Sequence, residues 1–130
     1  MPSLRTLKTG QPRVRGVAPI GRRTVDNIVF QSRGEMLRYL ELKLLLQAGS
    51  IKTLERQVPF PLIVNGQQIT TYYADFTYFL CGSGDYVVED AKGYRREGYR
   101  LKKQLVKALY NIDILETSVW RKRKGGVDGL

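Results

Sequence analysis

Two short turn sequences in the middle of the chain restrict its fold more than any other feature. Asn65-Gly66 is the strongest short signal for a β-hairpin, because both residues tolerate the positive φ angles of a two-residue turn. A second turn, at residues 81–84, has the sequence Cys-Gly-Ser-Gly. The two turns separate three strand-forming segments, at about 54–64, 67–80 and 85–92, which we expect to pair as an antiparallel meander.

Helix signals lie on both sides of this meander. Residues 32–35, Ser-Arg-Gly-Glu, have the form of a capping box, with a hydroxyl at the N-cap and a carboxylate three residues later. The leucines that follow predict a well-buried helix to about Gln47, and Gly49 suits its C-terminal stop. The spacing of apolar residues predicts a second, amphipathic helix over 98–110. Residues 112–119 are predicted to form a last strand.

This order of elements predicts an α+β fold with a mixed sheet flanked by helices. Pro59 and Pro61 interrupt the first strand, which favours an edge position or a bend there. Residues 1–27 contain prolines and glycines without an apolar period, so we interpret them as a basic flexible arm. Residues 28–119 then form one domain, and residues 120–130 form a basic tail.

The composition excludes several classes of active site. The chain has no histidine, which rules out Ser-His and Cys-His nucleophilic sites and histidine-ligated zinc. Its single cysteine, Cys81, cannot form an internal disulfide, which agrees with a reducing compartment. There is no signal-peptide pattern and no run of ~20 apolar residues. We therefore expect a cytoplasmic protein without a membrane partner, whose chemistry, if it is an enzyme, uses carboxylates, lysine, tyrosine or a hard metal ion.

The positive charge is concentrated at the two ends of the chain. Of the net charge of +10, residues 1–25 contribute +6 and residues 120–130 contribute +3. Basic arms on a near-neutral body favour a polyanionic partner such as DNA, the alternative being tails that keep the protein soluble. The candidate DNA-binding residues are Arg22, Arg23, Arg33, Arg95, Arg96, Lys102, Lys103, Arg121, Lys122, Arg123 and Lys124. For Lys102 and Lys103, the solvated face of a helix is an equal alternative.

The second hairpin has a register that can be predicted from its loop. If residues 81–84 form a four-residue loop, Leu80 faces Asp85 and Asp75 lies directly opposite Asp90. The Cβ atoms at such positions are ~4.5–5.5 Å apart on one face of the sheet. Two facing carboxylates repel each other, so this pair predicts a bound cation or a shared proton.

Side-chain alternation extends the candidate site along the third strand. Lys92 shares the face of Asp90, whereas Glu89 points to the other side of the sheet. Oxygen ligands of this kind suit Mg²⁺ or Mn²⁺, and a neighbouring lysine can orient the attacking water in phosphodiester hydrolysis. The alternative is a surface hairpin whose acids form salt bridges to Lys92 and nearby arginines. Glu35 has two roles open to it, as the third residue of the capping box or as a further metal ligand.

Four sequence motifs together resemble the PD-(D/E)XK nuclease superfamily. They are Ser-Arg-Gly-Glu at 32–35, Gln-Val-Pro-Phe-Pro-Leu at 57–62, Tyr-Ala-Asp-Phe at 73–76 and Glu-Asp-Ala-Lys-Gly at 89–93. Within the superfamily, they resemble small phage and prophage endonucleases that are related to Holliday-junction resolvases. The chain has Asp90 where that pattern more often has glutamate, so the ligand is one methylene shorter.

The resemblance implies a restriction-endonuclease-like αβββαβ core over about 30–119 and a metal-dependent endodeoxyribonuclease. It implies that Glu35, Asp75 and Asp90 hold Mg²⁺ or Mn²⁺ and that Lys92 is the catalytic lysine. The substrate class stays open between branched DNA, such as a Holliday junction, and non-specific duplex. Symmetric cleavage of two strands would require a homodimer. The alternatives are a non-catalytic DNA-binding protein and a phage assembly protein that uses the same basic arms.

Overall fold

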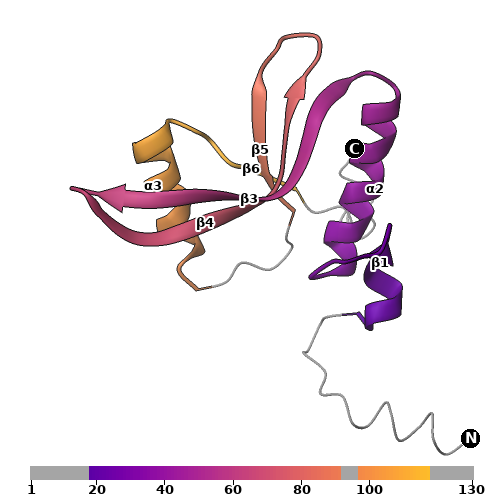
Figure 1. Cartoon of the computed structure of the whole chain (residues 1–130), viewed down its shortest axis with the longest axis horizontal. Coiled ribbons are helices and arrows are strands. Elements are labelled where there is room, and N and C mark those ends of the chain that lie inside the picture. The colour runs from indigo at the N-terminus through magenta and orange to yellow at the C-terminus, as the bar shows by residue number, and fades with distance from the viewer. Residues whose placement is uncertain (1–17, 92–96, 118–130) are drawn as a thin grey trace, which may run out of the picture.

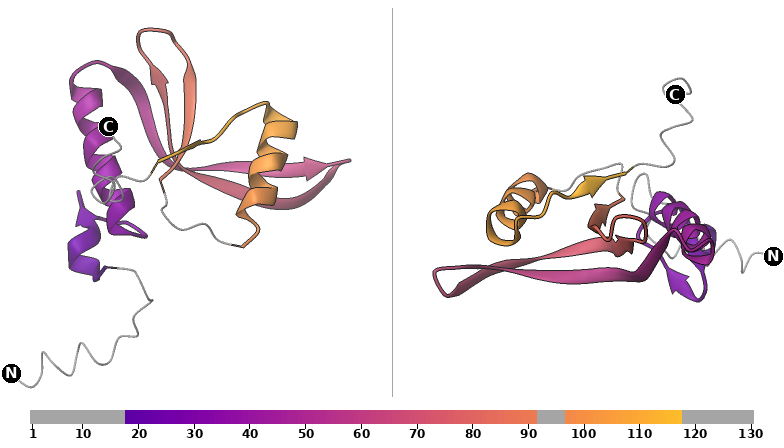
Figure 2. Two further views of the ribbon diagram at one scale, coloured as in Figure 1. Left: turned by 180° about the vertical axis from the view of Figure 1, so that it is seen from behind. Right: turned by 90° about the horizontal axis from the view of Figure 1, so that it is seen from above.

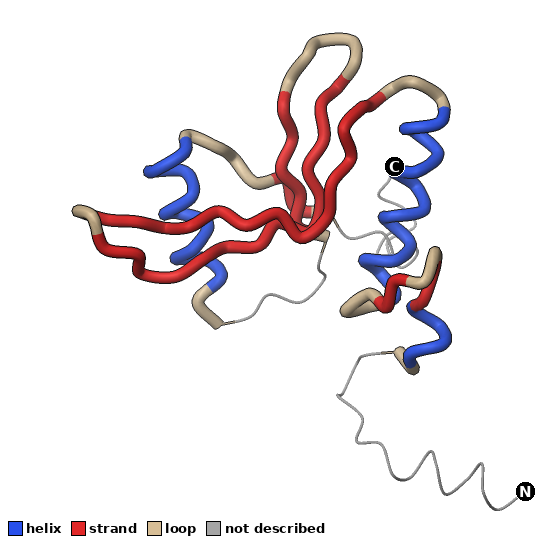
Figure 3. Tube along the Cα trace, viewed as in Figure 1, coloured by secondary structure: helices blue, strands red, loops and turns tan. Residues whose placement is uncertain are grey.

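The computed structural model describes residues 18–91 and 97–117. Its elements, in chain order, are the 3-10 helix η1 (Ile20–Arg23), β1 (Thr24–Val25), β2 (Ile28–Val29), α2 (Arg33–Gln47), β3 (Ile51–Val64), β4 (Gln67–Leu80), β5 (Tyr86–Asp90), α3 (Tyr99–Tyr110) and β6 (Leu115–Glu116). Figure 1 and Figure 3 show α2 and α3 at opposite ends of the strands. The predicted α+β fold is confirmed at this level.

The sheet is mixed, as the sequence predicts. Its strand order is β3-β4-β5-β6, in which the first three strands are antiparallel and β6 lies parallel to β5. β3, the strand with the two prolines, is an edge strand. Asn65 and Gly66 both have positive φ in the turn between β3 and β4, as the hairpin prediction requires. The predicted meander is therefore confirmed; β4 has the predicted bounds, and β3 begins three residues earlier than expected.

The boundary predicted for the N-terminal arm, at residue 27, is wrong, because residues 20–27 of that arm are structured. Residues 20–29 are not extended but form η1 and the short β1–β2 hairpin, whose turn residues Asp26 and Asn27 have positive φ. Arg23 holds this hairpin together, because its guanidinium donates to the carbonyl oxygens of Ala18 (2.8 Å) and Phe30 (2.6 Å). Residues 1–17 of the predicted arm lie outside the described residues.

The long β3–β4 hairpin is shared between two hydrophobic cores. Near its open end it packs with α2, where Phe76 and Tyr78 meet Phe30, Tyr39 and Leu42. Near the turn at residues 65–66 it packs with α3, as Figure 2 shows from above. The members of this second core are Phe60, Leu62, Tyr72, Ala74, Val88, Val106 and Ile114. The strands therefore change direction between the two helices (Figure 1).

Helix α2 begins and ends as its sequence predicts. The Ser32 hydroxyl accepts a hydrogen bond from the Glu35 N–H (3.1 Å), and Gly49 takes a left-handed conformation, with φ of +80°, after the last turn. The expectation of a helix buried on a wide surface is wrong. Leu40 and Leu44 are exposed, at 39% and 66%, because the sheet covers only one side of the helix.

The C-terminal half of the described fold is α3 followed by β6. The predicted helix over 98–110 is confirmed as Tyr99–Tyr110. The side chain of Val106, on this helix, is fully buried. The last strand is shorter than the predicted 112–119, because the described pairing with β5 is limited to Leu115 and Glu116. Among the residues that the structure describes, no helix is long and apolar enough to cross a membrane.

The two faces of α2 give a direct test of this packing. Leu42→Ala should lower the free energy of unfolding by about 2–5 kcal/mol, because it leaves a cavity at a fully buried position. Leu44→Ala, two residues later on the exposed side, should change it by less than about 0.5 kcal/mol. Urea denaturation of both variants measures the difference. Equal losses would contradict the orientation of α2.

Candidate active site

The three acidic residues predicted for the site are all buried. Glu35 is 0% exposed in the first turn of α2, Asp75 is 1% exposed in β4, and Asp90 is 3% exposed at the end of β5. Ionised carboxylates lose most of their hydration in such positions, so hydrogen bonds or positive charge must stabilise them. Their contacts therefore define what the site can do.

Glu35 and Asp75 meet at the side chain of Gln57, in the middle of β3. The Gln57 Nε2 donates to Glu35 Oε2 (3.1 Å) and to Asp75 Oδ1 (3.3 Å). One amide group thus bridges a carboxylate from the helix and a carboxylate from the sheet. Arg56 lies beside them, with its guanidinium 3.9 Å from Glu35 Oε2 and stacked over the ring of Phe30.

Asp75 and Asp90 are joined through the predicted hairpin register. Phe76 pairs with Glu89 and the following pairs keep the same register, so Asp75 and Asp90 are the next positions along the two strands. Asp75 Oδ2 accepts a hydrogen bond from the Ala91 N–H (2.8 Å). The prediction that places Asp75 opposite Asp90 agrees with this register.

Tyr72 lies close to both of these aspartates. Its hydroxyl donates to Asp90 Oδ2 (3.0 Å). Burial raises the pKa of the Tyr72 phenol well above its usual value, and the negative charges of Asp90 and Asp75 raise the same pKa further. Tyr72 therefore stays protonated and donates a hydrogen bond to the carboxylate of Asp90. Hydrogen bonds therefore run from Glu35 through Gln57 and Asp75 to the backbone of Ala91, the residue after Asp90.

The two roles considered for Glu35 are combined in one conformation. Its backbone N–H donates to the Ser32 hydroxyl, and its Oε1 accepts from the Gln31 N–H (3.3 Å), so it contributes to the start of α2. Its Oε2 at the same time accepts from Gln57. The capping role and a role in the site therefore do not exclude each other.

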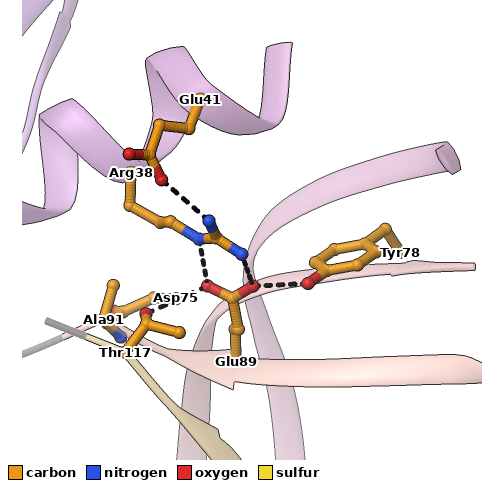
Figure 4. Close-up of polar contacts among 7 residues, drawn as sticks. All are labelled: Arg38, Glu41, Asp75, Tyr78, Glu89, Ala91 and Thr117. Atoms are coloured by element: carbon orange, nitrogen blue, oxygen red, sulfur yellow. Dashed lines mark hydrogen bonds and ion pairs between the residues drawn. The ribbon is translucent and has the colours of Figure 1, made fainter. Parts of the chain in front are cut away.

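Glu89 faces the opposite side of β5 and has a structural role. Its carboxylate forms a bidentate ion pair with Arg38 of α2 (2.8 and 2.7 Å) and accepts hydrogen bonds from Tyr78 and Thr117, as Figure 4 shows. The hydrogen bond to Glu89 raises the pKa of Arg38, so the pair stays ionised. Burial and Glu89 together raise the pKa of the Tyr78 phenol. The side chains of Glu89 and Asp90 thus point to opposite faces of β5, as predicted from the alternation of side chains along a strand.

The candidate DNA-binding residues have different positions in the structure. Arg22 and Arg33 are exposed near the start of α2, whereas Arg23 is half-buried in the contacts of the β1–β2 hairpin. On α3, Lys103 forms an ion pair with Glu116 (2.8 Å), and Lys102 is half-buried. The other candidates lie outside the described residues: Arg95, Arg96, Arg121, Lys122, Arg123 and Lys124. Lys92, the predicted catalytic lysine, also lies outside them.

The donor set can be compared with the needs of a divalent cation. Carboxylate oxygens are the ligands that Mg²⁺ and Mn²⁺ prefer. Glu35 and Asp75 provide such oxygens on either side of one amide nitrogen, so the two oxygens are within reach of one small group. Within residues 18–91 and 97–117, however, no three acidic or cysteine side chains are grouped closely enough to hold a metal ion. Glu35, Asp75 and Asp90 are thus of the chemical type that binds a divalent cation. Two of them, Glu35 and Asp75, lie close together.

Gln57 and Tyr72 are site residues that the sequence reasoning did not identify. The ring of Tyr72 lies in the core, and only its hydroxyl reaches the site. Gln57 is the first residue of the Gln-Val-Pro-Phe-Pro-Leu motif, and this motif was the only sequence signal that pointed to Gln57. Its φ of +49°, unusual for a residue other than glycine inside a strand, could not be predicted from the sequence.

Residues 21–124 match a protein family whose description is "Protein of unknown function (DUF1064)". The match covers most of the chain. The chain belongs to this family. Neither the curated proteins nor the solved structures contain a match to it.

In this family member, removing one partner of the Arg38–Glu89 pair should strongly destabilise the fold, although the intact pair adds little net stability. Arg38→Met should lower the free energy of unfolding by about 3–5 kcal/mol, because it leaves a buried carboxylate without its cation. The double variant Arg38→Met with Glu89→Gln should recover part of this loss. Urea denaturation of the single and double variants measures the coupling.

Glu41→Gln is the matched control for this pair. Glu41 also forms an ion pair with Arg38, but its side chain is 42% exposed, so the loss should stay below about 1 kcal/mol. Strictly additive effects of the Arg38 and Glu89 substitutions would contradict a coupled buried pair.

Proposed function

We propose that this protein is a divalent-metal-dependent DNA endonuclease with a restriction-endonuclease-like core. The observation that carries the proposal is that hydrogen bonds link two buried acids to each other and to the backbone beside a third. Glu35 comes from a helix, Asp75 from a central strand and Asp90 from the next strand, and Gln57 and Ala91 connect them. Desolvated carboxylates that converge from separate elements are typical of a cation site.

In this proposal, Glu35, Asp75 and Asp90 hold Mg²⁺ or Mn²⁺. Such a cation, when bound, polarises a phosphate oxygen and makes a water molecule more acidic. Tyr72 orients the carboxylate of Asp90 through its hydrogen bond. Lys92 follows Ala91 in the chain and supplies the positive charge that stabilises the reacting phosphate.

The charge of the chain supports DNA as the substrate. Basic residues at the two ends supply phosphate contacts, and each contact releases counterions from the DNA. Arg22 and Arg33 lie on the exposed surface near the start of α2, the helix turn that also contains Glu35. This position suits contacts to the DNA backbone beside the acids. The proposal covers both branched DNA and linear duplex, with a homodimer where two strands are cut symmetrically.

A second candidate function is DNA binding without catalysis, in a DNA-binding or phage assembly protein. One observation favours it: the part of the chain that the structure describes has no group of three acids close enough to hold a metal ion. Incubation with a four-way junction and with linear duplex, each with and without Mg²⁺ or Mn²⁺, separates the two candidates. Binding without cleavage under every condition would favour the second.

Asp75→Asn and Asp90→Asn should each abolish cleavage while leaving the fold intact. Each change removes a charged ligand but keeps the size of the side chain, and it also relieves repulsion between buried carboxylates. A nicking assay and melting curves on the same samples check both expectations. Asp85→Asn, an exposed position beside the loop at residues 81–84, is the control and should retain full activity. Cleavage at the wild-type rate by either site variant would exclude this site.

Lys92→Ala should separate catalysis from metal binding. Lysine is not a metal ligand here, so Mn²⁺ affinity should stay unchanged or rise slightly, whereas the cleavage rate should fall by about 10²–10³. Single-turnover cleavage and Mn²⁺ titration measure the two effects. Lys52→Ala, at an exposed position of β3, removes the same charge away from the site and should change neither. A parallel loss of Mn²⁺ binding would show that Lys92 has a structural role instead.

A further inference from the structure

Gln57 occupies an unfavourable backbone conformation in the middle of a strand. Its φ of +49° is in the left-handed region, where residues other than glycine are uncommon. The pairs on either side, Arg56 with Phe76 and Val58 with Ala74, keep one register, so the strand continues through this position. Strained conformations of this kind persist where the surrounding structure requires them, and they are frequent at functional sites.

The side chain of Gln57 shows what this conformation achieves. Both of its described hydrogen bonds leave from the same nitrogen and end on carboxylates, Glu35 Oε2 at 3.1 Å and Asp75 Oδ1 at 3.3 Å. An amide nitrogen has two hydrogens, so it can serve both acceptors at once. Glu35 and Asp75 belong to different elements, and Gln57 fixes the position of one relative to the other.

The chemical type of this bridge is informative. A glutamine side chain is neutral, so it aligns the two acids without placing a charge between them. The neighbouring Arg56 stacks over the ring of Phe30, with its guanidinium carbon 4.6 Å from the ring centroid, and is 3.9 Å from Glu35. The residue between the two carboxylates is thus the neutral amide, which also has an oxygen that a cation can bind.

We propose that Gln57 is the residue that prepares this site for a divalent cation. In the cation-free protein its Nε2 holds Glu35 and Asp75 on either side of one small group. When a cation binds between the carboxylates, the amide rotates and presents its oxygen to the cation. This inference rests on the proposed function, because it assigns a further ligand to the same site.

Mn²⁺ binding to the full-length protein, measured by isothermal titration calorimetry, tests the proposal together with melting curves in EDTA. Gln57→Met keeps the length of the side chain but removes the amide. It should weaken Mn²⁺ binding by about 10-fold or more, as expected for the loss of a residue that orients metal ligands. Gln57→Glu keeps an oxygen and adds a charge. It should lower the melting temperature in EDTA and bind Mn²⁺ at least as tightly as the wild type.

Gln68→Met and Gln68→Glu are matched controls, because Gln68 is exposed in the neighbouring strand β4 and should leave Mn²⁺ affinity unchanged. If Gln57→Met binds Mn²⁺ as tightly as the wild type, the assignment of Gln57 is overturned and the proposed function stands. If the wild type binds no Mn²⁺, the proposed function itself is overturned. If Gln57→Glu is unfolded in EDTA but folds when Mn²⁺ is added, the proposal is supported. The introduced carboxylate would then be tolerated beside Glu35 and Asp75 only when a cation is bound.

Discussion

The ion pair between Arg38 and Glu89 is the interaction on which the arrangement of the site depends. It connects α2 to β5 across the core, and Glu89 is fully buried within it. Because side chains alternate along a strand, a Glu89 directed at α2 turns its neighbour Asp90 to the other face. There Asp90 meets the hydroxyl of Tyr72. A buried ion pair contributes little net stability, but it defines which face of β5 meets the helix.

The bend of the β3–β4 hairpin is the second constraint. A straight hairpin of this length would pack along one helix, whereas this one reaches two cores, one with α2 and one with α3. Thr53 and Gln57, both with positive φ, lie in the part of β3 between the turn that follows α2 and the prolines. The bend brings Gln57 and Asp75 to the start of α2. The site therefore forms beside a residue of β3 with a strained backbone angle, as is frequent at functional positions.

Much of the fold could be predicted from short-range signals, and the remainder depended on long-range contacts. The Asn65-Gly66 turn fixed the first hairpin, and the register that pairs positions near Asp75 and Asp90 followed from the loop length alone. The partner of Glu89 could not be predicted, because Arg38 is 51 residues away in sequence. The ordered turn and hairpin at 20–29 were missed because they contain no apolar period. Gln57 was missed for a different reason, because its role depends on a backbone angle that no sequence pattern predicts.

The buried acids differ in how the fold stabilises them, and this difference is the basis for separating structural from functional residues. Glu89 receives a full positive charge from Arg38 in a bidentate pair, so its ionised form is satisfied within the fold. The partners of Asp75 and Asp90 include neutral donors, namely an amide, a backbone N–H and a phenol. Neutral donors of this kind orient a carboxylate without adding a charge of their own. A strand that carries both kinds of acid on adjacent residues therefore presents one to the core and the other to the site.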